Sequence, residues 1–183
     1  MAEMANIMEK YDLGSYKWHS VDMVHLLAES SRRSFSDRNE YLADPDFVDM
    51  PLERMTSKSY AEFRGSDITD RATPSSEVGP GLEPPHEGEH TTHYSVVDSS
   101  GNAVSVTTTI NSWFGSKVTV RGAGFILNNE MDDFATKPGS PNQYGLVQGT
   151  NNAVGPGKRM LSAMTPSVVT DPNGELFFVT GTP

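Results

Sequence analysis

The segment His86-Glu87-Gly88-Glu89-His90 has the spacing of a zinc-protease motif, with two histidines four positions apart and a glutamate beside the first. That motif binds zinc only on a helix, because the helix turns both histidines to one face. Two prolines precede the segment, a glycine lies inside it and a threonine-rich stretch follows it. The sequence therefore favours a solvated acidic loop, with chance metal capture by His86, His90 and His93 in an uncut chain as the alternative.

Thr91 and Thr92 lie where this loop gives way to a stretch that alternates like a strand. Threonine is common in strands, so its type alone indicates only local structure. Catalysis by Thr91 requires a cut after His90, because the freed α-amino group, with a pKa of about 7.7–8.0, can then take the proton of its own hydroxyl. In the uncut chain that nitrogen is an amide and cannot act as a base.

Two further segments carry polar groups that suit a binding site. Residues 128–134 include Glu130 and Asp133, and two carboxylates three positions apart can converge on one cation. A polar loop leaving a strand has the same composition, so both interpretations stand on local grounds. Residues 139–149 are rich in glycine and polar residues and carry one aromatic residue, Tyr144. A loop of that kind can serve as a lid over a site.

The first third of the chain is predicted to be helical. A helix is expected over residues 20–41, with Ser20 as N-cap and Asp22 near the positive end of the helix dipole. Apolar residues at helical spacing predict its buried side: Met23, Val24, Leu26 and Leu27. Charged residues are expected on its solvent side: Glu29, Arg32 and Arg33. A shorter helix is predicted over residues 52–63, after Pro51.

Residues 65–90 are rich in glycine, proline and acidic residues and predict a mobile surface linker, the kind of segment where proteolysis concentrates. Strands are predicted over residues 91–98 and 102–110, which alternate and are rich in β-branched residues. Between them, Ser99-Ser100-Gly101 suits a three-residue hairpin loop. Counting outward from this loop pairs Thr91 with Thr109, whereas a two-residue turn would shift the register by one. Further strands are predicted near residues 124–127, 167–170 and 176–180.

Composition excludes several classes of protein. A net charge of −10 argues against a nucleic-acid binder, which presents a clustered positive face. Without cysteine there is no disulfide framework, thiol nucleophile or thiolate metal site. No signal peptide is recognisable at the N-terminus, and no stretch approaches the roughly 20 apolar residues of a membrane-spanning helix. A chain that ends three residues past a predicted strand is expected to be a fragment of a longer protein.

Residues 91–98, Thr-Thr-His-Tyr-Ser-Val-Val-Asp, resemble the start of the small subunit of bacterial γ-glutamyltransferases, also called glutathione hydrolases. Other segments resemble that family in the same order along the chain: residues 38–48, 74–77, 106–111, 127–134, 138–149, 155–166 and 180–183. The resemblance covers essentially the whole chain. It implies an α+β fold that is part of the four-layer αββα sandwich of N-terminal-nucleophile (Ntn) hydrolases, incomplete at both ends.

The resemblance also implies an activity and a division of the chain. Thr91 would attack the carbonyl of His90 and separate a large subunit, whose helical C-terminal part is residues 1–64, from a small subunit that begins with residues 91–183. Residues 65–90 would be the linker that ends at the cut. The freed Thr91 would then take a γ-glutamyl group from glutathione or a related compound and pass it to water, an amino acid or a peptide. The family works as a large–small heterodimer and uses no cofactor and no metal.

Site residues follow from the same resemblance, position by position. Thr109 matches a threonine that hydrogen-bonds the nucleophile, and Asn111 matches a substrate-contacting asparagine. Glu130 and Asp133 match the residues that hold the substrate ammonium. Two more positions complete the expected site: Ser162, which matches a contact of the α-carboxylate, and Tyr144, which matches the lid residue.

Two departures from the family pattern bear on activity. The family often has two adjacent serines where this chain reads Ser162-Ala163, and a lost hydrogen bond to a charged group costs about 1.5–3 kcal/mol if nothing replaces it. In the family that the chain resembles, the glycine pair of the oxyanion hole comes directly after the position of Pro183. The family's arginine that holds the α-carboxylate comes from the large subunit, before the position of Met1. We therefore expect this polypeptide alone to be inactive.

The sequence is also compatible with two alternative functions. One is a related acylase, such as a cephalosporin acylase, which shares the fold and the self-cleavage but takes other acyl groups. The other is an uncleaved, non-catalytic binding protein on the same scaffold. By resemblance alone, a full-length bacterial relative is expected in the periplasm or the medium.

Overall fold

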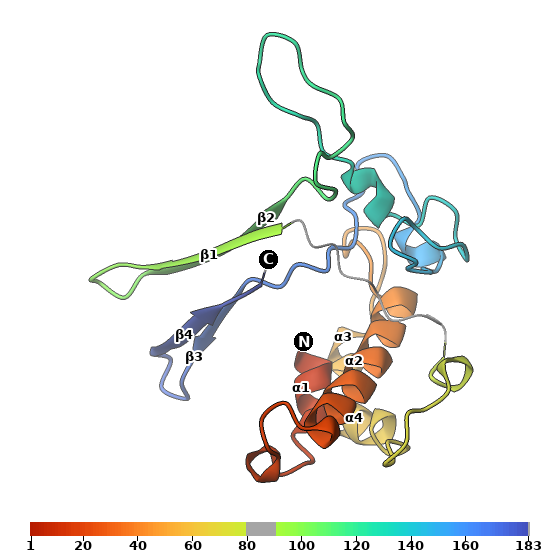
Figure 1. Cartoon of the computed structure of the whole chain (residues 1–183), viewed down its shortest axis with the longest axis vertical. Helices are drawn as coiled ribbons and strands as arrows, with labels where there is room; N and C mark the ends of the chain where they lie inside the picture. The colour runs from red at the N-terminus through yellow and green to blue at the C-terminus, as the bar shows by residue number, and fades with distance from the viewer. Residues whose placement is uncertain (80–90, 183) are drawn as a thin grey trace. The chain divides into compact units, whose positions relative to one another are not determined.

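The computed structural model describes residues 1–79 and 91–182, and Figure 1 shows its helices and strands. The residues divide into two compact units. A helical unit holds residues 1–79 and 134–161, and a strand unit holds residues 91–133 and 162–182. Each unit therefore combines segments that are distant in the sequence, and residues 134–161 return to the helices rather than staying with the strands that precede them.

Four α-helices and three 3-10 turns build the helical unit. They are α1 (Ala2–Met8), η1 (Leu13–Ser15), α2 (Val21–Tyr41), α3 (Leu52–Met55), α4 (Lys58–Arg64), η2 (Ser75–Glu77) and η4 (Thr150–Asn152). The long helix α2 confirms the helix predicted over residues 20–41. Its N-terminus is stabilised as expected, because the Ser20 hydroxyl accepts a hydrogen bond from the Met23 amide at 3.3 Å.

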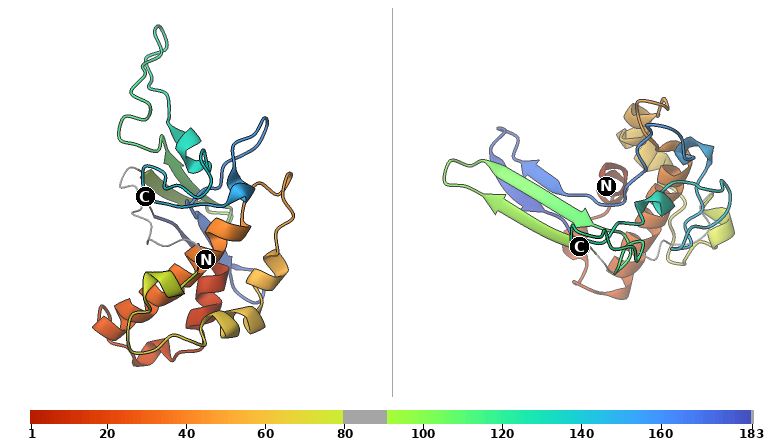
Figure 2. Two further views of the ribbon diagram at one scale, coloured as in Figure 1. Left: turned by 90° about the vertical axis from the view of Figure 1, so that its right-hand side faces the viewer. Right: turned by 90° about the horizontal axis from the view of Figure 1, so that it is seen from above.

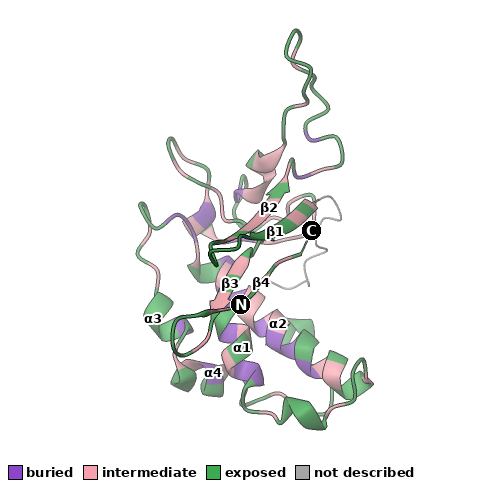
Figure 3. Ribbon diagram, turned by 90° about the vertical axis from the view of Figure 1, so that its left-hand side faces the viewer, coloured by how far each residue is buried: buried purple, intermediate pink, exposed green. Residues whose placement is uncertain are grey.

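The prediction of which side of α2 is buried was wrong for most of the residues named, although Leu26 is buried as predicted. Helix α2 carries both buried and exposed residues (Figure 3). Glu29 and Arg33 are each only 1% exposed, whereas Val24 and Leu27 are exposed. Arg33 Nη1 donates to Glu29 Oε2 at 2.6 Å, and its Nη2 lies 2.9 Å from Asp67 Oδ1. Burying a charged side chain is costly unless the charge is paired and hydrogen-bonded. The ion pairs and hydrogen bonds of Glu29 and Arg33 compensate that cost and allow both side chains to be buried.

Residues 66–79 supply part of that pairing. Thr73 donates its hydroxyl proton to Glu29 Oε2 at 2.7 Å, and its carbonyl accepts from Arg32 at 2.8 Å. Val78 is buried, and its carbonyl accepts from the Ser36 hydroxyl at 3.4 Å. The segment therefore runs along α2 with only the short η2 as regular structure. The predicted mobility of the linker and the subunit boundary stay predictions, and residues 80–90, including His86 and His90, lie outside the described residues.

The helix predicted over residues 52–63 is instead two helices, α3 and α4. The break falls at Thr56 and Ser57. The Thr56 hydroxyl donates to the Leu52 carbonyl at 2.8 Å, which closes the end of α3. The Ser57 hydroxyl accepts from the Tyr60 amide at 3.2 Å and caps the start of α4. The hydroxyls of Thr56 and Ser57 thus bond to backbone groups at the helix ends, and the predicted helix is divided into two short helices.

A small core joins α1, α2 and α4. Apolar side chains buried in the helical unit include Ile7, Leu26 and Ala61. Beside them, Asp37 accepts from the Tyr60 hydroxyl at 3.0 Å and pairs with Arg64 Nε at 2.8 Å. Burial, together with a hydrogen bond and the negative charge from Asp37, raises the pKa of Glu3 to about 8. This polar cluster therefore favours a protonated Glu3.

Two antiparallel hairpins build the strand unit, β1 (Thr91–Val97) with β2 (Ala103–Thr109) and β3 (Ser167–Thr170) with β4 (Leu176–Thr180). They confirm the strands predicted in these four places. The register pairs Thr91 with Thr109, as the turn chemistry predicted. The Asp98 amide donates to the Asn102 carbonyl at 3.0 Å, and Gly101 has a φ of 82°, which places glycine at the left-handed position of the loop.

The strand predicted near residues 124–127 does not form. Residues 112–128 make a long loop (Figure 1, upper part) in which Leu127 donates to Val118 and Val120 to Phe125, both at 2.9 Å. Only an isolated bridge between Thr119 and Ile126 pairs the two sides. Glycines with positive φ interrupt the ladder, at positions 115, 122 and 124. The apolar run around residues 124–127 therefore forms no strand, because glycine in this conformation interrupts strand pairing.

The two hairpins of the strand unit lie side by side (Figure 2). The Ser105 hydroxyl donates to the Thr180 carbonyl at 3.0 Å, which joins β2 to the end of β4. Gly181 follows directly, and a Cβ atom there would lie 2.5 Å from Nδ1 of His93. The end of β4 therefore packs against β1 at a point where only glycine fits. In the described parts of the chain, no helix has the length and apolar character needed to cross a bilayer.

Candidate active site

Thr91 and Thr109 lie opposite each other at the open end of the β1–β2 hairpin. Paired residues of an antiparallel ladder turn their side chains to the same face, so the two hydroxyls share one side of the sheet. The same face carries His93 and Thr107, whose Nδ1 and Oγ1 atoms are 2.8 Å apart. This end of the hairpin is therefore a polar surface around the predicted nucleophile.

Asn111 follows Thr109 and turns the chain away from β2. Its amide donates to Thr109 Oγ1 at 2.9 Å, so the Thr109 hydroxyl acts as the acceptor in this bond. Asn111 is buried and has a φ of 71°, an uncommon conformation that asparagine tolerates better than most residues. The structure therefore brings Thr91, Thr109 and Asn111 together at one end of the hairpin.

Asn129 holds Asn111 beside the acidic pair. Its carbonyl accepts from Asn111 Nδ2 at 3.1 Å and from the Asp132 amide at 3.2 Å. Its side chain bonds twice to Ser112, with Oδ1 accepting from the amide and Nδ2 donating to the hydroxyl, both at 3.0 Å. Asn129 thus closes the base of the 112–128 loop. Sequence reasoning assigned it no role, and its only signal was its place between Asn128 and Glu130.

Glu130 and Asp133 lie at the two ends of the 3-10 turn η3 (Glu130–Asp133), directly after Asn129. Burial raises the pKa of Glu130 to about 7, and the charge of Asp133 and a hydrogen bond to it add to the rise. The two carboxyl groups therefore share a proton near neutral pH. A cation entering between them would favour loss of that proton, so the pair has the chemistry of an ammonium site.

Ser162 belongs to the strand unit but lies apart from this network in the sequence. Its exposed hydroxyl accepts from the Met164 amide at 3.1 Å, a bond within its own turn. The structure therefore shows a local role for Ser162, and its predicted contact with a substrate carboxylate stays a prediction.

Tyr144 belongs to the helical unit, so its position relative to Thr91 is not defined. Its loop is organised by Asn142, whose Oδ1 accepts from the amides of Tyr144 and Leu146 at 2.9 and 3.0 Å. Gly145, with a φ of 79°, completes the turn. Tyr144 therefore lies at the tip of a compact loop, and its role as a lid stays a prediction.

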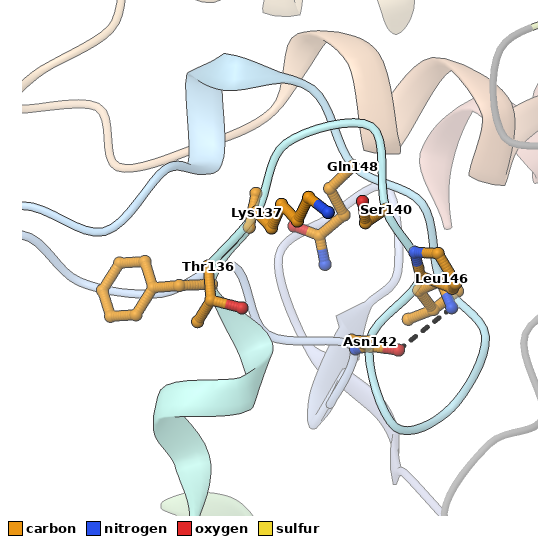
Figure 4. A pocket seen from close by; sticks show the side chains of 9 residues that line it. Thr136, Lys137, Ser140, Asn142, Leu146 and Gln148 are labelled. Carbon is orange, nitrogen blue, oxygen red and sulfur yellow. Dashed lines mark hydrogen bonds between the residues drawn. The ribbon is translucent and has the colours of Figure 1, made fainter.

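A small polar pocket lies at the base of this loop (Figure 4). Lys137, Ser140 and Gln148 line it, and Gln148 is buried. None of the predicted site residues is among its lining residues. The pocket therefore belongs to the framework of the loop.

The sequence matches the profile of the family described as Gamma-glutamyltranspeptidase over residues 1–183, so the chain belongs to that family. It is 50% identical to a glutathione hydrolase proenzyme of Pseudomonas sp. strain A14 and 47% identical to that of Escherichia coli K12. All of this chain aligns in both cases, but it spans only 32% of each relative.

The fold is similar to that of a cephalosporin acylase from Bacillus halodurans, with a TM-score of 0.73 and 26% sequence identity. This similarity covers 97% of this chain and 29% of the acylase chain. The mixed helix-and-strand architecture is therefore that of a segment shared by γ-glutamyltranspeptidases and acylases, both of which are Ntn hydrolases.

Proposed function

We propose that the full-length protein is a γ-glutamyltransferase and glutathione hydrolase whose nucleophile is Thr91. The observation that carries this proposal is the hydrogen-bonded path Thr109–Asn111–Asn129, which leads from the partner of Thr91 to the acidic pair. A threonine hydroxyl beside a second hydroxyl, with an ammonium site close in the same unit, suits transfer of an acyl group that carries a free amine.

The first step is autoproteolysis. The Thr91 hydroxyl attacks the carbonyl carbon of His90, the peptide bond breaks, and its nitrogen takes a proton to become the free α-amino group. Water then hydrolyses the ester between His90 and Thr91. With a pKa of about 7.7–8.0, the new amino group can act as base for the hydroxyl in later turnovers.

In the second step, Thr91 attacks the γ-glutamyl carbonyl and forms an acyl-enzyme. Thr109 is proposed to hydrogen-bond the nucleophile, and Asn111 to contact the substrate. Glu130 and Asp133 hold the substrate ammonium. Water completes hydrolysis of glutathione, whereas an amino acid or a peptide completes transfer. Splitting one difficult acyl transfer into two easier steps is the advantage of covalent catalysis.

The remaining features of the whole protein follow from its family. We propose that the two units belong to a four-layer αββα sandwich and that the cut products, divided after residue 90, stay together as a large–small heterodimer. Ser162 would contact the α-carboxylate, and Tyr144 would close over the occupied site. We also propose a periplasmic or extracellular location, as expected for a bacterial relative.

The substrate class is tested with two chromogenic donors on the full-length protein. γ-Glutamyl-p-nitroanilide should be cleaved, and glutaryl-p-nitroanilide, which lacks only the α-amino group, should be cleaved far more slowly. A Glu130→Gln variant should narrow the difference between the two donors. Equal rates on both donors would contradict an ammonium site at Glu130 and Asp133.

A related acylase is the second candidate function, favoured by the similarity of fold to the cephalosporin acylase and by Ala163 in place of a second serine. An acylase that takes acyl groups without a free amine should cleave the glutaryl donor at least as fast as the γ-glutamyl donor. The same pair of substrates therefore separates the two functions in one experiment.

A further inference from the structure

The helical unit is built from chain on both sides of residue 90. Residues 1–79 precede the proposed cut and residues 134–161 follow it. Their contacts are therefore made within one chain before autoproteolysis and between two products afterwards. This consequence rests on the proposed cut at Thr91.

The end of α2 is where the two segments join. A helix leaves its last four carbonyl groups without partners inside the helix. Here the Asn39 carbonyl accepts from the Gly149 amide at 3.3 Å, and the Glu40 carbonyl accepts from Asn151 Nδ2 at 2.9 Å. Residues after the cut thus cap a helix that lies before it.

An ion pair reinforces this junction a few residues further on. Asp44 is 3% exposed, and its carboxylate accepts from the Arg159 amide at 2.7 Å, from Nε at 3.1 Å and from Nη2 at 2.5 Å. Arg159 Nη2 also lies 2.6 Å from Asp46 Oδ2. Hydrogen bonds from Arg159 hold the pKa of Asp44 well below its usual range. A forked contact to a buried carboxylate is among the stronger polar contacts in proteins.

Residues 134–161, which these contacts hold on α2, include the Tyr144 loop. Arg159 lies near one end of residues 134–161, where Arg38 Nη2 also donates to the Leu161 carbonyl at 3.4 Å. Within the segment, Asn152 is fully buried, and its carbonyl accepts from the Ala135 amide at 2.9 Å. The Leu161 amide in turn donates to Asn152 Oδ1 at 3.1 Å, so Asn152 joins the two ends of the segment. Arg159 then links the segment to the chain before the cut.

We propose that Asp44 and Arg159 form a clamp between the two products of autoproteolysis and hold the Tyr144-bearing segment of one product on helix α2 of the other. The partner recognised by Asp44 is thus the small subunit of the same precursor. Because the clamp forms before the cut, residues 134–161 stay bound to α2 after the peptide bond is broken.

The clamp is tested by urea-dependent separation of the two products of the full-length protein, followed by size-exclusion chromatography. Arg159→Ala should lower the urea midpoint of separation by on the order of 1 M, because it leaves the buried Asp44 carboxylate without its partner. Asp44→Ala should lower the midpoint by less, because Arg159 is 64% exposed and keeps its contact with Asp46. The double variant should lose less than the sum of the two single losses. Arg159→Lys should fall between Arg159→Ala and the parent, because lysine cannot make the fork.

Matched controls are Asp49→Ala and Arg71→Ala, exposed residues that take part in no ion pair among the described residues. They should leave the midpoint unchanged. Strictly additive losses in the double variant, or midpoints equal to the parent in both single variants, would overturn the clamp. Mass spectra of the same samples report the cut separately. An uncut parent chain would refute the proposed autoproteolysis and the clamp together, whereas cut but equally stable variants would refute the clamp alone.

Discussion

Glu130 gives the most specific prediction about substrate binding. Its pKa is raised to about 7 by burial and by Asp133, so the carboxyl group is largely protonated in the free protein below that pH. The substrate ammonium that we propose to bind here would favour the ionised form, because two negative charges would then face one positive charge. Binding must therefore displace a proton at low pH, and the affinity for a γ-glutamyl donor should fall as the pH falls below 7.

The size of this effect follows from the titration. Each pH unit below the pKa lowers the ionised fraction about tenfold, so KM should rise about 30-fold between pH 8 and pH 5.5. The assay is the initial rate of γ-glutamyl-p-nitroanilide cleavage by the full-length protein over that range, with kcat and KM fitted separately. The Thr91 amino group is proposed to act in the chemical step, so its titration should affect kcat more than KM.

Three variants decide whether Glu130 is responsible. Glu130→Gln should raise KM at pH 8 and make it nearly independent of pH. Asp133→Asn should move the rise in KM to lower pH, because it removes the charge that helps to raise the pKa of Glu130. Asp132→Asn, beside the pair, should keep the parent profile. A KM that rises equally in Glu130→Gln and in the parent would refute the assignment.

Three further predictions concern other parts of the chain. Glu3→Gln should reduce the pH dependence of the melting temperature. Because the pKa of Glu3 is raised to about 8 in the folded state, the stability of the parent should fall as the pH rises from about 4.5 to 8. Calorimetry at pH 5 and pH 8 should therefore show a decrease in melting temperature that is smaller in the variant by a few degrees. Gly181→Ala should displace the His93 ring and lower stability by about 1–3 kcal/mol in urea unfolding, whereas Gly155→Ala, where a methyl group meets ordinary contacts, should not. Asn129→Ala should raise KM and lower kcat together because it frees the base of the 112–128 loop, and equal kinetics in variant and parent would contradict that role.

Local rules predicted the parts of the fold that depend on neighbours in sequence. The three-residue loop ending in Gly101 was enough to pair Thr91 with Thr109, because hairpin register is set by the turn. Ser20 was likewise recognisable as the cap of α2. These features require only the chemistry of a few adjacent residues.

Burial that depends on distant partners could not be predicted in this way. The sequence pattern places Glu29 and Arg33 on the solvent side, yet they are buried because Thr73 and Asp67 bond to them from 44 and 34 positions away. The return of residues 134–161 to the helices has the same character. Its contacts include the pair of Arg159 with Asp44, and nothing in the spacing along the chain indicates that contact.

The candidate site also has a part that the sequence predicted and a part that depends on contacts between distant residues. The pairing of Thr91 with Thr109 followed from the turn, and the roles of Asn111, Glu130 and Asp133 came from family resemblance. The connection among them through Asn129 could not be predicted from the sequence, because it joins a backbone carbonyl to a side chain 18 positions away. Contacts of that kind leave no periodic signal in a sequence.

The central claim is that Thr91 becomes an N-terminal nucleophile, and mass spectrometry of the purified full-length protein tests it most directly. A cut between His90 and Thr91 should appear in the parent and in Thr92→Ala and be absent in Thr91→Ala. An uncut parent, a cut at another bond, or a Thr91→Ala variant cut as efficiently as the parent would contradict the account.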